Sequence, residues 1–458
     1  MAVESIEKAS ASYLLKHAAD VKWRLEHGDL GGIRQAVIIP VRAEKEYLFG
    51  TLFALASNAR HDLDQTLVVC VVNNREIDWN DRELISDNQM TLAYLRAMVA
   101  GFVPDFSAGN EVTIEYISGI LRNGLRIACV DASSSGLTLS DRDGVGMARK
   151  IGMDRTLEIM AHQDRLSPDT LICLDADTLV EDNYLSSIGQ FYLNHNNPAA
   201  VVSFAHQDSR DGDILEAITR YEIFLRYYTI GLRYAGSPYA FYSIGSTITC
   251  KASSYVAVHG MSLKQAGEDF YFLNKLAKNG PMGHITSTTV HPSSRPSSRV
   301  PFGTGPAVQR FLSQRPDKST VYHPEIFDML KKVLECIKRN PVQCPAEILK
   351  ELRQIHPAVV DFFNSQRFSA SWEHIRSNSG NPAVLRRHFH IWFDGFRTLK
   401  LVHYLSDNVL PKQELFSSLK ILLNKSNAPF KELDFANPRM MLADQIAILE
   451  HLRELEIS

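Results

Sequence analysis

Two aspartates, Asp175 and Asp177, directly follow the apolar run Leu-Ile-Cys-Leu at 171–174. In an extended chain, side chains two residues apart lean to the same side, so these carboxylates repel unless a cation lies between them. A hard divalent ion such as Mg2+ or Mn2+ takes oxygen ligands and also accepts phosphate oxygens. The pattern predicts a cation site at the end of a strand. The alternative is that one aspartate caps the following helix while the other is solvated.

A second acidic pair, Glu268 and Asp269, opens the segment GEDFYFLNKLAKNG at 267–280. Apolar residues then recur at helical spacing, and Gly280 is a plausible stop. Acids in a first turn also favour the helix dipole. Taken alone, the pair therefore indicates a stabilised helix N-terminus as readily as a site.

The elements that must position these acids alternate between strands and helices. Continuous Val- and Ile-rich runs indicate a mostly parallel sheet covered on both faces. Such sheets bind ligands beyond the carboxyl ends of their strands, where the two aspartates lie. The predicted strands are 36–41, 66–72, 125–132, 170–177 and 199–205. The predicted helices between and before them include 4–28, 44–59, 145–162 and 182–194.

The character of the chain changes after about residue 315, where apolar residues keep helical spacing without clear strands. We predict an N-terminal helical extension at 1–33, an α/β domain at 34–315 and an all-helical C-terminal region at 316–458. Two aromatic-rich segments have two interpretations each. Residues 220–243 either line an acceptor site or pack a core, and residues 384–405 form either an interfacial helix on a membrane surface or a packed one.

Composition excludes several classes of protein. The 458 residues are 45% apolar and 22% charged with a formal net charge of −3, and no Lys/Arg stripe points to nucleic acid. The six cysteines are far apart and never form C-x-x-C, which favours buried free thiols in a reducing compartment. No signal-peptide core and no run of roughly 18 apolar residues is present. We therefore expect a cytoplasmic protein without a transmembrane segment.

Five segments in this order resemble the family 2 glycosyltransferases, which have the GT-A fold, and the resemblance spans residues 34–292. The resemblance implies a Rossmann-like α/β domain that binds a nucleotide-sugar donor and a divalent metal, Mn2+ or Mg2+. The segments are AVIIPVRAEKEYLFGTL, GVGMARKIG, LICLDADTLVEDNYL, IGSTITCKASSYVAVHGM and GEDFYFLNKLAKNG.

The resemblance assigns roles to both acidic pairs. Asp177 would hold the metal on the donor diphosphate, with Asp175 helping through the ribose or the metal. Asp269 would be the general base that deprotonates an acceptor hydroxyl in an inverting reaction. Glu268 would orient that base or contact the acceptor.

The resemblance also implies a nucleotide-sugar site around the first two strands. Pro40 and Glu44 match the family's turn near the nucleobase and ribose, although Ala43 replaces the usual Asn. The second strand ends in Asn73 and Asn74 in place of the family's Asp-Asp-Gly-Ser, so an asparagine must read the base or recognition differs.

Further assignments complete the implied site. Gly245 and Ser246 belong to its nucleotide-sugar part, and Arg149 matches a basic position near the nucleotide, the alternative being an exposed helix arginine. His291 is a candidate third metal ligand or a hydrogen-bonded side chain. Arg295 and Arg299 lie in a Pro- and Ser-rich loop that either closes over the diphosphate or links two regions.

The function that follows is metal-dependent transfer of one sugar from a UDP- or GDP-sugar to a small-molecule or glycan hydroxyl, with inversion. The Q-x-x-R-W motif of processive synthases is absent. One alternative is a retaining GT-A enzyme of the glucosyl- or mannosyl-glycerate synthase type. The other is a non-catalytic sugar-nucleotide- or glycan-binding protein. The sequence indicates neither the donor sugar, the acceptor nor the oligomeric state, and it leaves peripheral membrane contact open.

Overall fold

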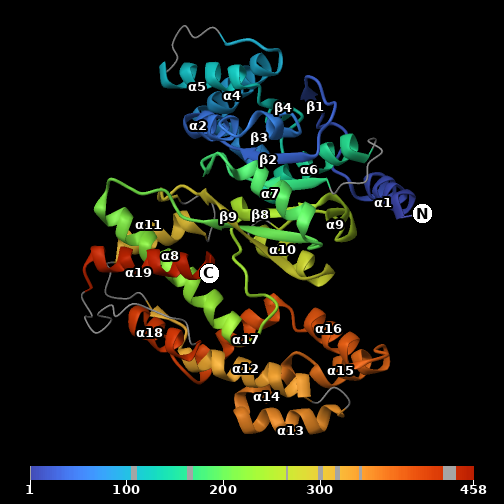
Figure 1. The fold of residues 1–458 in the computed structure, drawn as a ribbon, viewed down its shortest axis with the longest axis vertical. Coiled ribbons are helices and arrows are strands. Elements are labelled where there is room, and N and C mark those ends of the chain that lie inside the picture. The colour runs from blue at the N-terminus through green and yellow to red at the C-terminus, as the bar shows by residue number, and fades with distance from the viewer. Residues whose placement is uncertain are drawn as a thin grey trace. The chain divides into compact units, whose positions relative to one another are not determined.

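The computed structural model describes residues 2–104, 111–161, 169–264, 267–297, 303–314, 320–339, 343–426 and 440–457. They group into two compact units (Figure 1). The first unit contains mainly residues 1–208 and 243–294, and the second mainly 209–242 and 304–458. This grouping departs from the boundaries expected at 33/34 and 315/316. The N-terminal helix packs within the first unit, and a long central helix belongs to the second.

The first unit is built on a nine-stranded sheet of order β1-β4-β3-β2-β5-β8-β7-β9-β6. Strands β2, β3, β4, β5, β7 and β9 run in one direction, and β1, β8 and β6 run against them. The strands are β1 Leu25–His27, β2 Gln35–Val41, β3 Thr66–Asn73, β4 Arg126–Ala132, β5 Thr170–Cys173, β6 Leu179–Val180, β7 Ala199–Phe204, β8 Ile248–Lys251 and β9 Met282–His291. The predicted mostly parallel α/β sheet is confirmed.

The order of the strands places a switch point between β2 and β5. From β2 the chain moves outward through β3 and β4, then returns to β5 on the other side of β2. Both strands are completely buried, as their unbroken Val, Ile and Leu runs predict. Open α/β sheets bind ligands beyond the carboxyl ends of the strands at such a point.

Helices flank this sheet and connect its strands. Helix α6 packs on β2 and β3, and α4 packs on β3 and β4. The helices of the first unit are α1 Ala2–His17, α2 Lys45–Ala56, α3 Arg60–Leu63, η1 Glu76–Asn80, α4 Arg82–Val99, α5 Glu111–Asn123, α6 Val145–Ala161, α7 Tyr184–Asn194, η2 Gly245–Thr247, α9 Ala252–Ala257 and α10 Glu268–Asn279. The helix predicted at 4–28 is too long: it ends at His17, and β1 pairs with β4 as an edge strand instead.

The second unit is helical, as predicted, apart from the short pair β10 Thr320–Val321 and β11 Gln413–Glu414, which corrects the all-helical expectation. Its core gathers Tyr227 of the central helix α8 with Phe327, Trp372 and Phe389. The helices are α8 Gly212–Tyr234, α11 Thr304–Gln314, α12 Pro324–Arg339, α13 Pro345–Ile355, α14 Pro357–Ser365, α15 Phe368–Ser377, α16 Pro382–Trp392, α17 Gly395–Asn408, α18 Leu415–Lys425 and α19 Leu442–Ile457.

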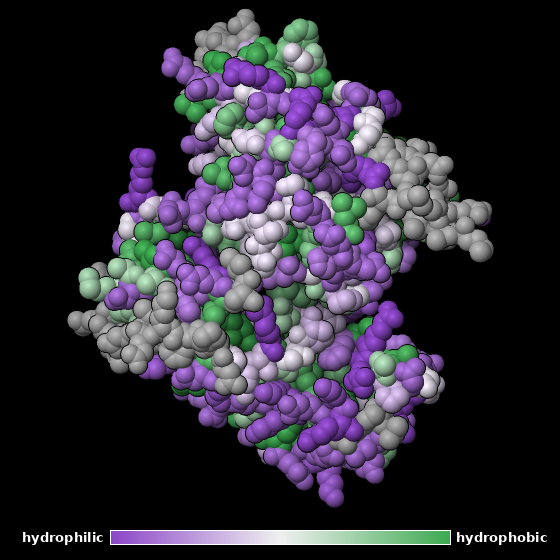
Figure 2. All heavy atoms as spheres, in the orientation of Figure 1, coloured by the Kyte–Doolittle hydropathy of each residue, from purple (hydrophilic) through white to green (hydrophobic). Residues whose placement is uncertain are grey.

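The helices of residues 384–405 are packed against the protein's own core, which favours the packed helix over the membrane-surface helix. Phe389, Leu401 and Leu405 of that segment are completely buried in the core of the second unit. Hydrophilic residues cover most of the face drawn in Figure 2. Among the described residues, no helix has the length and apolar character needed to cross a membrane.

Candidate active site

The acidic turn, residues 175–178, follows β5 at the switch point and is held by other elements of the first unit. The Thr51 hydroxyl of α2 donates to the carbonyl oxygen of Ala176 at 2.9 Å. The Gln207 amide donates to the carbonyl oxygen of Asp177 at 2.8 Å. Because both central carbonyls are bonded, the backbone that carries the two carboxylates is fixed.

A buried arginine joins the acidic turn to the second acidic pair. Arg149 of α6 is 3% exposed, and its Nη2 donates to Oδ1 of Asp175 at 2.6 Å. Its Nη1 donates to Oε1 of Glu268, also at 2.6 Å. The second oxygen of Asp175, Oδ2, accepts from the Ser246 hydroxyl at 2.6 Å. The two acidic motifs, distant in sequence, therefore form one cluster, and Arg149 is not the exposed helix residue of the alternative interpretation.

Two glycines make room for this cluster. A Cβ on Gly245 would lie 2.2 Å from Nη2 of Arg149. A Cβ on Gly146 of α6 would lie 2.6 Å from the Ser262 carbonyl oxygen and 2.9 Å from Cγ of Glu268. All three distances are too short for a Cβ unless the neighbouring atoms move. Close packing against the cluster thus explains why glycine occupies positions 146 and 245.

The cluster alters the acidity of its members. Withdrawal from water, and then the neighbouring charge of Glu268, raise the pKa of Asp269 to about 7, although Arg149 opposes the shift. Burial opposes the charge of Arg149, but Asp175 and Glu268 together raise its pKa well above the ordinary value. Asp269 is half-buried, and its Oδ1 accepts from its neighbour's amide, Phe270 N, at 2.7 Å. It therefore combines partial access with a pKa near neutrality, as a general base requires.

His291 lies beside the acidic turn through strand pairing. It faces Leu179 in the antiparallel β6–β9 ladder. The Gln207 amide that holds the Asp177 carbonyl also donates to the carbonyl oxygen of His291 at 2.7 Å. Nδ1 of His291 lies 3.0 Å from the carbonyl oxygen of Ala205, which fits a protonated Nδ1 and leaves Nε2 as the ring acceptor. Metal-binding histidines commonly have this second bond.

The donor set constrains how a metal could bind. Within the described ranges, no group of three or more His, Cys, Asp or Glu side chains is placed to hold a metal ion. Both oxygens of Asp175 already accept hydrogen bonds from Arg149 and Ser246. Nε2 of His291 lies 3.6 Å from Oε1 of Glu181. The roles of Asp177 and His291 as metal ligands stay predictions.

In the turn after β2, Ala43 stands where the resemblance leads one to expect an asparagine. Ala43 adopts a left-handed φ of 52° and donates its N–H to Oδ1 of Asn88 at 2.9 Å. Asn88 is completely buried in α4 and also donates to the Asn73 carbonyl oxygen at 3.1 Å. Asn88 thus ties the turn after β2 to the end of β3. Pro40 and Glu44, the matching residues of this turn, are both buried.

The asparagines after β3 are engaged within the protein. Asn73 Nδ2 donates to the carbonyl oxygens of Val41 and Val71, at 3.1 Å and 3.0 Å, and Asn74 is completely buried. These bonds join the ends of β2 and β3. The role of Asn73 in base recognition stays a prediction.

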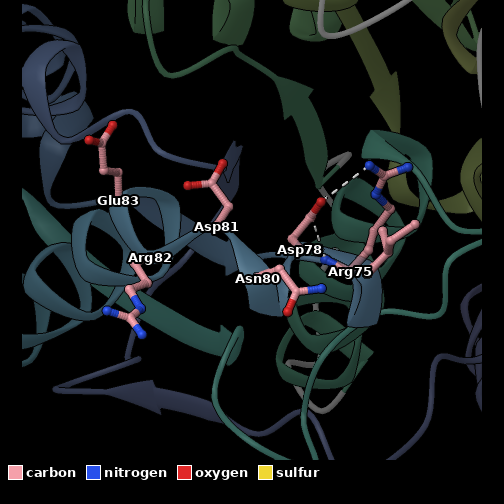
Figure 3. A pocket seen from close by; sticks show the side chains of 7 residues that line it. Arg75, Asp78, Asn80, Asp81, Arg82 and Glu83 are labelled. Atoms are coloured by element: carbon pink, nitrogen blue, oxygen red, sulfur yellow. Dashed lines mark hydrogen bonds and ion pairs between the residues drawn. The ribbon is translucent and has the colours of Figure 1, made fainter.

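An open depression of about 690 Å3 lies beyond β3, next to this turn (Figure 3). Asp78 of η1 accepts from Arg42 at 2.9 Å and from Arg75 at 3.2 Å. Burial alone would raise the pKa of Asp78, but these hydrogen bonds lower it. The depression follows β3 and the acidic turn follows β5, and β2 lies between these two parallel strands. Its lining residues are Arg75, Ile77, Asp78, Asn80, Asp81, Arg82 and Glu83.

The structure gathers most of the predicted site residues in the first unit. Arg295 groups with the second unit, and Arg299 lies outside the described residues, so their phosphate role stays a prediction. Sequence reasoning missed several residues that hold the site. Thr51 offered a local signal, as a polar residue in the mostly apolar α2, whereas the others depend on tertiary contacts. The residues missed are Thr51, Asp78, Asn88, Gly146, Thr178 and Gln207.

Comparisons with known proteins give weak similarities only. No protein-family model matches the chain, and no curated protein matches its sequence. Residues 1–349 of S. aureus TarS in complex with UDP-GlcNAc align with 12% identity over 80% of this chain and 92% of that chain, at a TM-score of 0.36. The mannosyltransferase PcManGT from Pyrobaculum calidifontis, in complex with GDP-Man and Mn2+, aligns with 13% identity over 88% and 96%, at 0.33. Alignments at these values establish neither a shared fold nor a shared activity.

Proposed function

We propose that the chain is a metal-dependent glycosyltransferase of the GT-A type, which moves one sugar from a nucleotide-sugar donor to a hydroxyl acceptor. The observation that carries this proposal is the Arg149 bridge between Asp175 and Glu268 at the switch point of the sheet. The bridge supports a single centre in which one acidic motif faces the donor and the other faces the acceptor. The resemblance of five ordered segments to family 2 glycosyltransferases agrees with it.

Asp269 is the general base of the proposed reaction. Its carboxylate accepts the proton of the acceptor hydroxyl as that oxygen forms a bond to the anomeric carbon. The bond from the anomeric carbon to the diphosphate oxygen breaks with its electron pair, and the configuration inverts. Glu268, held by Arg149 at 2.6 Å, keeps negative charge beside Asp269 and thereby sustains its basicity.

Asp177 and His291 would hold the divalent cation. That cation, when bound, would neutralise the departing nucleoside diphosphate as a Lewis acid. Asp175, with both oxygens bonded, fixes the acidic turn and adds negative charge next to the donor.

We place the nucleoside end of the donor along the turn after β2, toward the depression of Figure 3. Asp78, fixed by Arg42 and Arg75, is a buried carboxylate shortly after the strand where the family has its acid. Each oxygen of Asp78 accepts two hydrogen bonds from Arg42 and Arg75, so Asp78 would act on the nucleotide by holding these two arginines beside the depression. Asp78→Asn should therefore change the preference among nucleotides more than the rate of transfer.

A thermal-shift panel of UDP-, GDP-, TDP- and CDP-sugars, with and without Mn2+ or Mg2+, tests the proposal. A ligand of the folded state raises its apparent stability by mass action, so a donor should stand out only when the metal is present. Asp177→Ala should lose that shift. If no sugar nucleotide stabilises the protein with either metal, the proposed function is wrong.

A further inference from the structure

Helix α6 carries a second buried charge cluster next to Arg149, bonded to different partners. Asp154 is completely buried, and its two oxygens accept four hydrogen bonds. Oδ1 accepts from the hydroxyls of Tyr13 at 2.8 Å and Tyr255 at 2.7 Å. Oδ2 accepts from the Ala19 amide and from Nζ of Lys150, each at 2.7 Å. Every oxygen of this carboxylate is therefore doubly occupied.

Half of that set comes from the N-terminal segment, residues 8–23. Tyr13 of α1 and the peptide of Ala19 supply two of the four donors to Asp154. Lys150 Nζ also donates to the Tyr13 hydroxyl at 2.8 Å and lies 5.1 Å from the centroid of its ring. Arg155, one residue beyond Asp154, donates to the Ala19 carbonyl oxygen at 2.8 Å. The N-terminal segment is thus bonded to α6 along more than one turn.

Tyr13 is the main buried anchor of α1. Among the side chains of α1 that the structure describes, Ser10 and Tyr13 are buried, whereas Leu15 is 86% exposed. Gly260 leaves space for the anchor, because a Cβ there would lie 2.2 Å from the Tyr13 hydroxyl oxygen. The hydroxyl of Tyr13 joins α1 to Asp154, Lys150 and Tyr255, so the position of α1 depends on it.

We propose that Tyr13 is a positioning residue for the active site: through Asp154 and Lys150 it fixes α6, and α6 in turn aims Arg149 at Asp175 and Glu268. Lys150 and Arg149 are adjacent in α6, so a change in the bonds of one moves the backbone that carries the other. Without Tyr13, buried Lys150 and Asp154 lose partners that water does not replace, and α6 must shift or open. The structural reading of this proposal is that Tyr13 fixes the position of α6, and it does not depend on the proposed function. The catalytic reading is that this position sets the rate of sugar transfer, and it rests on the proposed function.

Hydrogen exchange on the full chain tests the structural reading without any substrate. Tyr13→Phe removes the hydroxyl and keeps the ring, and Leu15→Ala is a matched control on the exposed side of the same helix. We expect exchange in α6 and at the start of α10 to become about tenfold faster in Tyr13→Phe and unchanged in Leu15→Ala. Faster exchange confined to residues 8–23 would show a local structural role and overturn the proposal.

A kinetic cycle tests the catalytic reading. Tyr13→Phe should lower kcat about tenfold with little change in KM for the donor, because the centre is misaligned while donor contacts persist. In an Arg149→Lys background the same substitution should have little further effect, since both act through one guanidinium. Additive effects would contradict the mechanism. Absence of turnover in the unaltered protein would reject the proposed function, while the exchange result would still decide on Tyr13.

Discussion

Two buried arginines, one in each unit, bridge pairs of carboxylates, yet only one belongs to a candidate site. Arg149 contacts Asp175 and Glu268 at 2.6 Å each in the first unit. Arg226 of α8 contacts Glu222 at 2.7 Å and Glu456 of α19 at 3.0 Å in the second. By pairing and distance alone, the two clusters look alike.

Their surroundings separate them. Glu222 and Glu456 are 1% and 7% exposed, and Arg453 and the Tyr242 hydroxyl bond the same two carboxylates. By contrast, Asp175 is 36% exposed, at the carboxyl end of a strand. In the Arg149 cluster one carboxylate reaches the surface, where a ligand can meet it. In the Arg226 cluster every partner is enclosed, so its ion pairs serve to dock helices.

The largest effect should follow from removing the proposed base. Asp269→Asn should lower kcat by about 10²–10⁴-fold, because the amide cannot accept the acceptor proton. Steady-state release of nucleoside diphosphate measures this. Glu456→Gln, in the Arg226 cluster, is the matched control and should leave kcat unchanged. Equal rates for Asp269→Asn and the unaltered protein would exclude Asp269 as base.

Changes in the Arg226 cluster should instead lower the stability of the protein. Arg226→Met leaves Glu222 and Glu456 with fewer partners and should lower the free energy of unfolding by about 3–5 kcal/mol. Urea unfolding measures the change. Arg210→Met, at an exposed position of the same unit, should remain within about 0.5 kcal/mol. A loss as small as that control would mean that the Arg226 cluster is not needed for docking.

A smaller effect should come from filling the space beside Arg149. In Gly245→Ala the new Cβ would meet Nη2 at 2.2 Å, so the guanidinium must move. We expect a loss of about 1–3 kcal/mol in stability together with a reduced kcat. Gly212→Ala is the control, because no atom lies within 4 Å of its Cβ position. Unchanged kcat in Gly245→Ala would show that the position of Arg149 does not matter to the rate.

The smallest effect should be the dependence on pH. A pKa of about 7 for Asp269 predicts that kcat/KM rises with pH and levels off above that value, since the base must be ionised. Its raised pKa also means that the folded state binds this proton more tightly than the unfolded state. The stability contributed by Asp269 is therefore lost as pH rises through 7. Urea unfolding of Asp269→Asn should lack this part of the pH dependence, and an identical profile would contradict the assignment.

The sequence predicted the parts of the fold and site that depend on local pattern. Buried Val-rich runs predicted the strands of the sheet, and Asp175 and Asp177 follow a buried strand as expected. Their role in a site stays a prediction. The family resemblance predicted Arg149 near the nucleotide, but its bonds to Asp175 and Glu268 join residues far apart in sequence, which no local pattern reveals.

Other features depend on tertiary contacts that override local preference. The helix expected at 4–28 ends at His17 because residues 25–27 pair with β4. The turn at Ala43 is held by Asn88 on another helix, a contact that no local pattern shows. The pair Lys150 and Asp154 was visible as two charges at i, i+4 spacing, but only its burial shows that Tyr13 completes it.

The most direct test of whether the active site lies at the Arg149 cluster compares two variants, Arg149→Met and Arg226→Met. The measurement is the steady-state rate of nucleoside diphosphate release at equal concentrations of folded protein, with the donor found by the thermal-shift panel. Replacing Arg149 frees Asp175 and Glu268 to move, whereas Glu222 and Glu456 of the Arg226 cluster are enclosed by helices of the second unit. We predict that Arg149→Met lowers kcat at least about 100-fold and that Arg226→Met keeps it within about twofold of the unaltered protein. Equal losses, or full activity in Arg149→Met, would contradict the assignment of the active site to the Arg149 cluster.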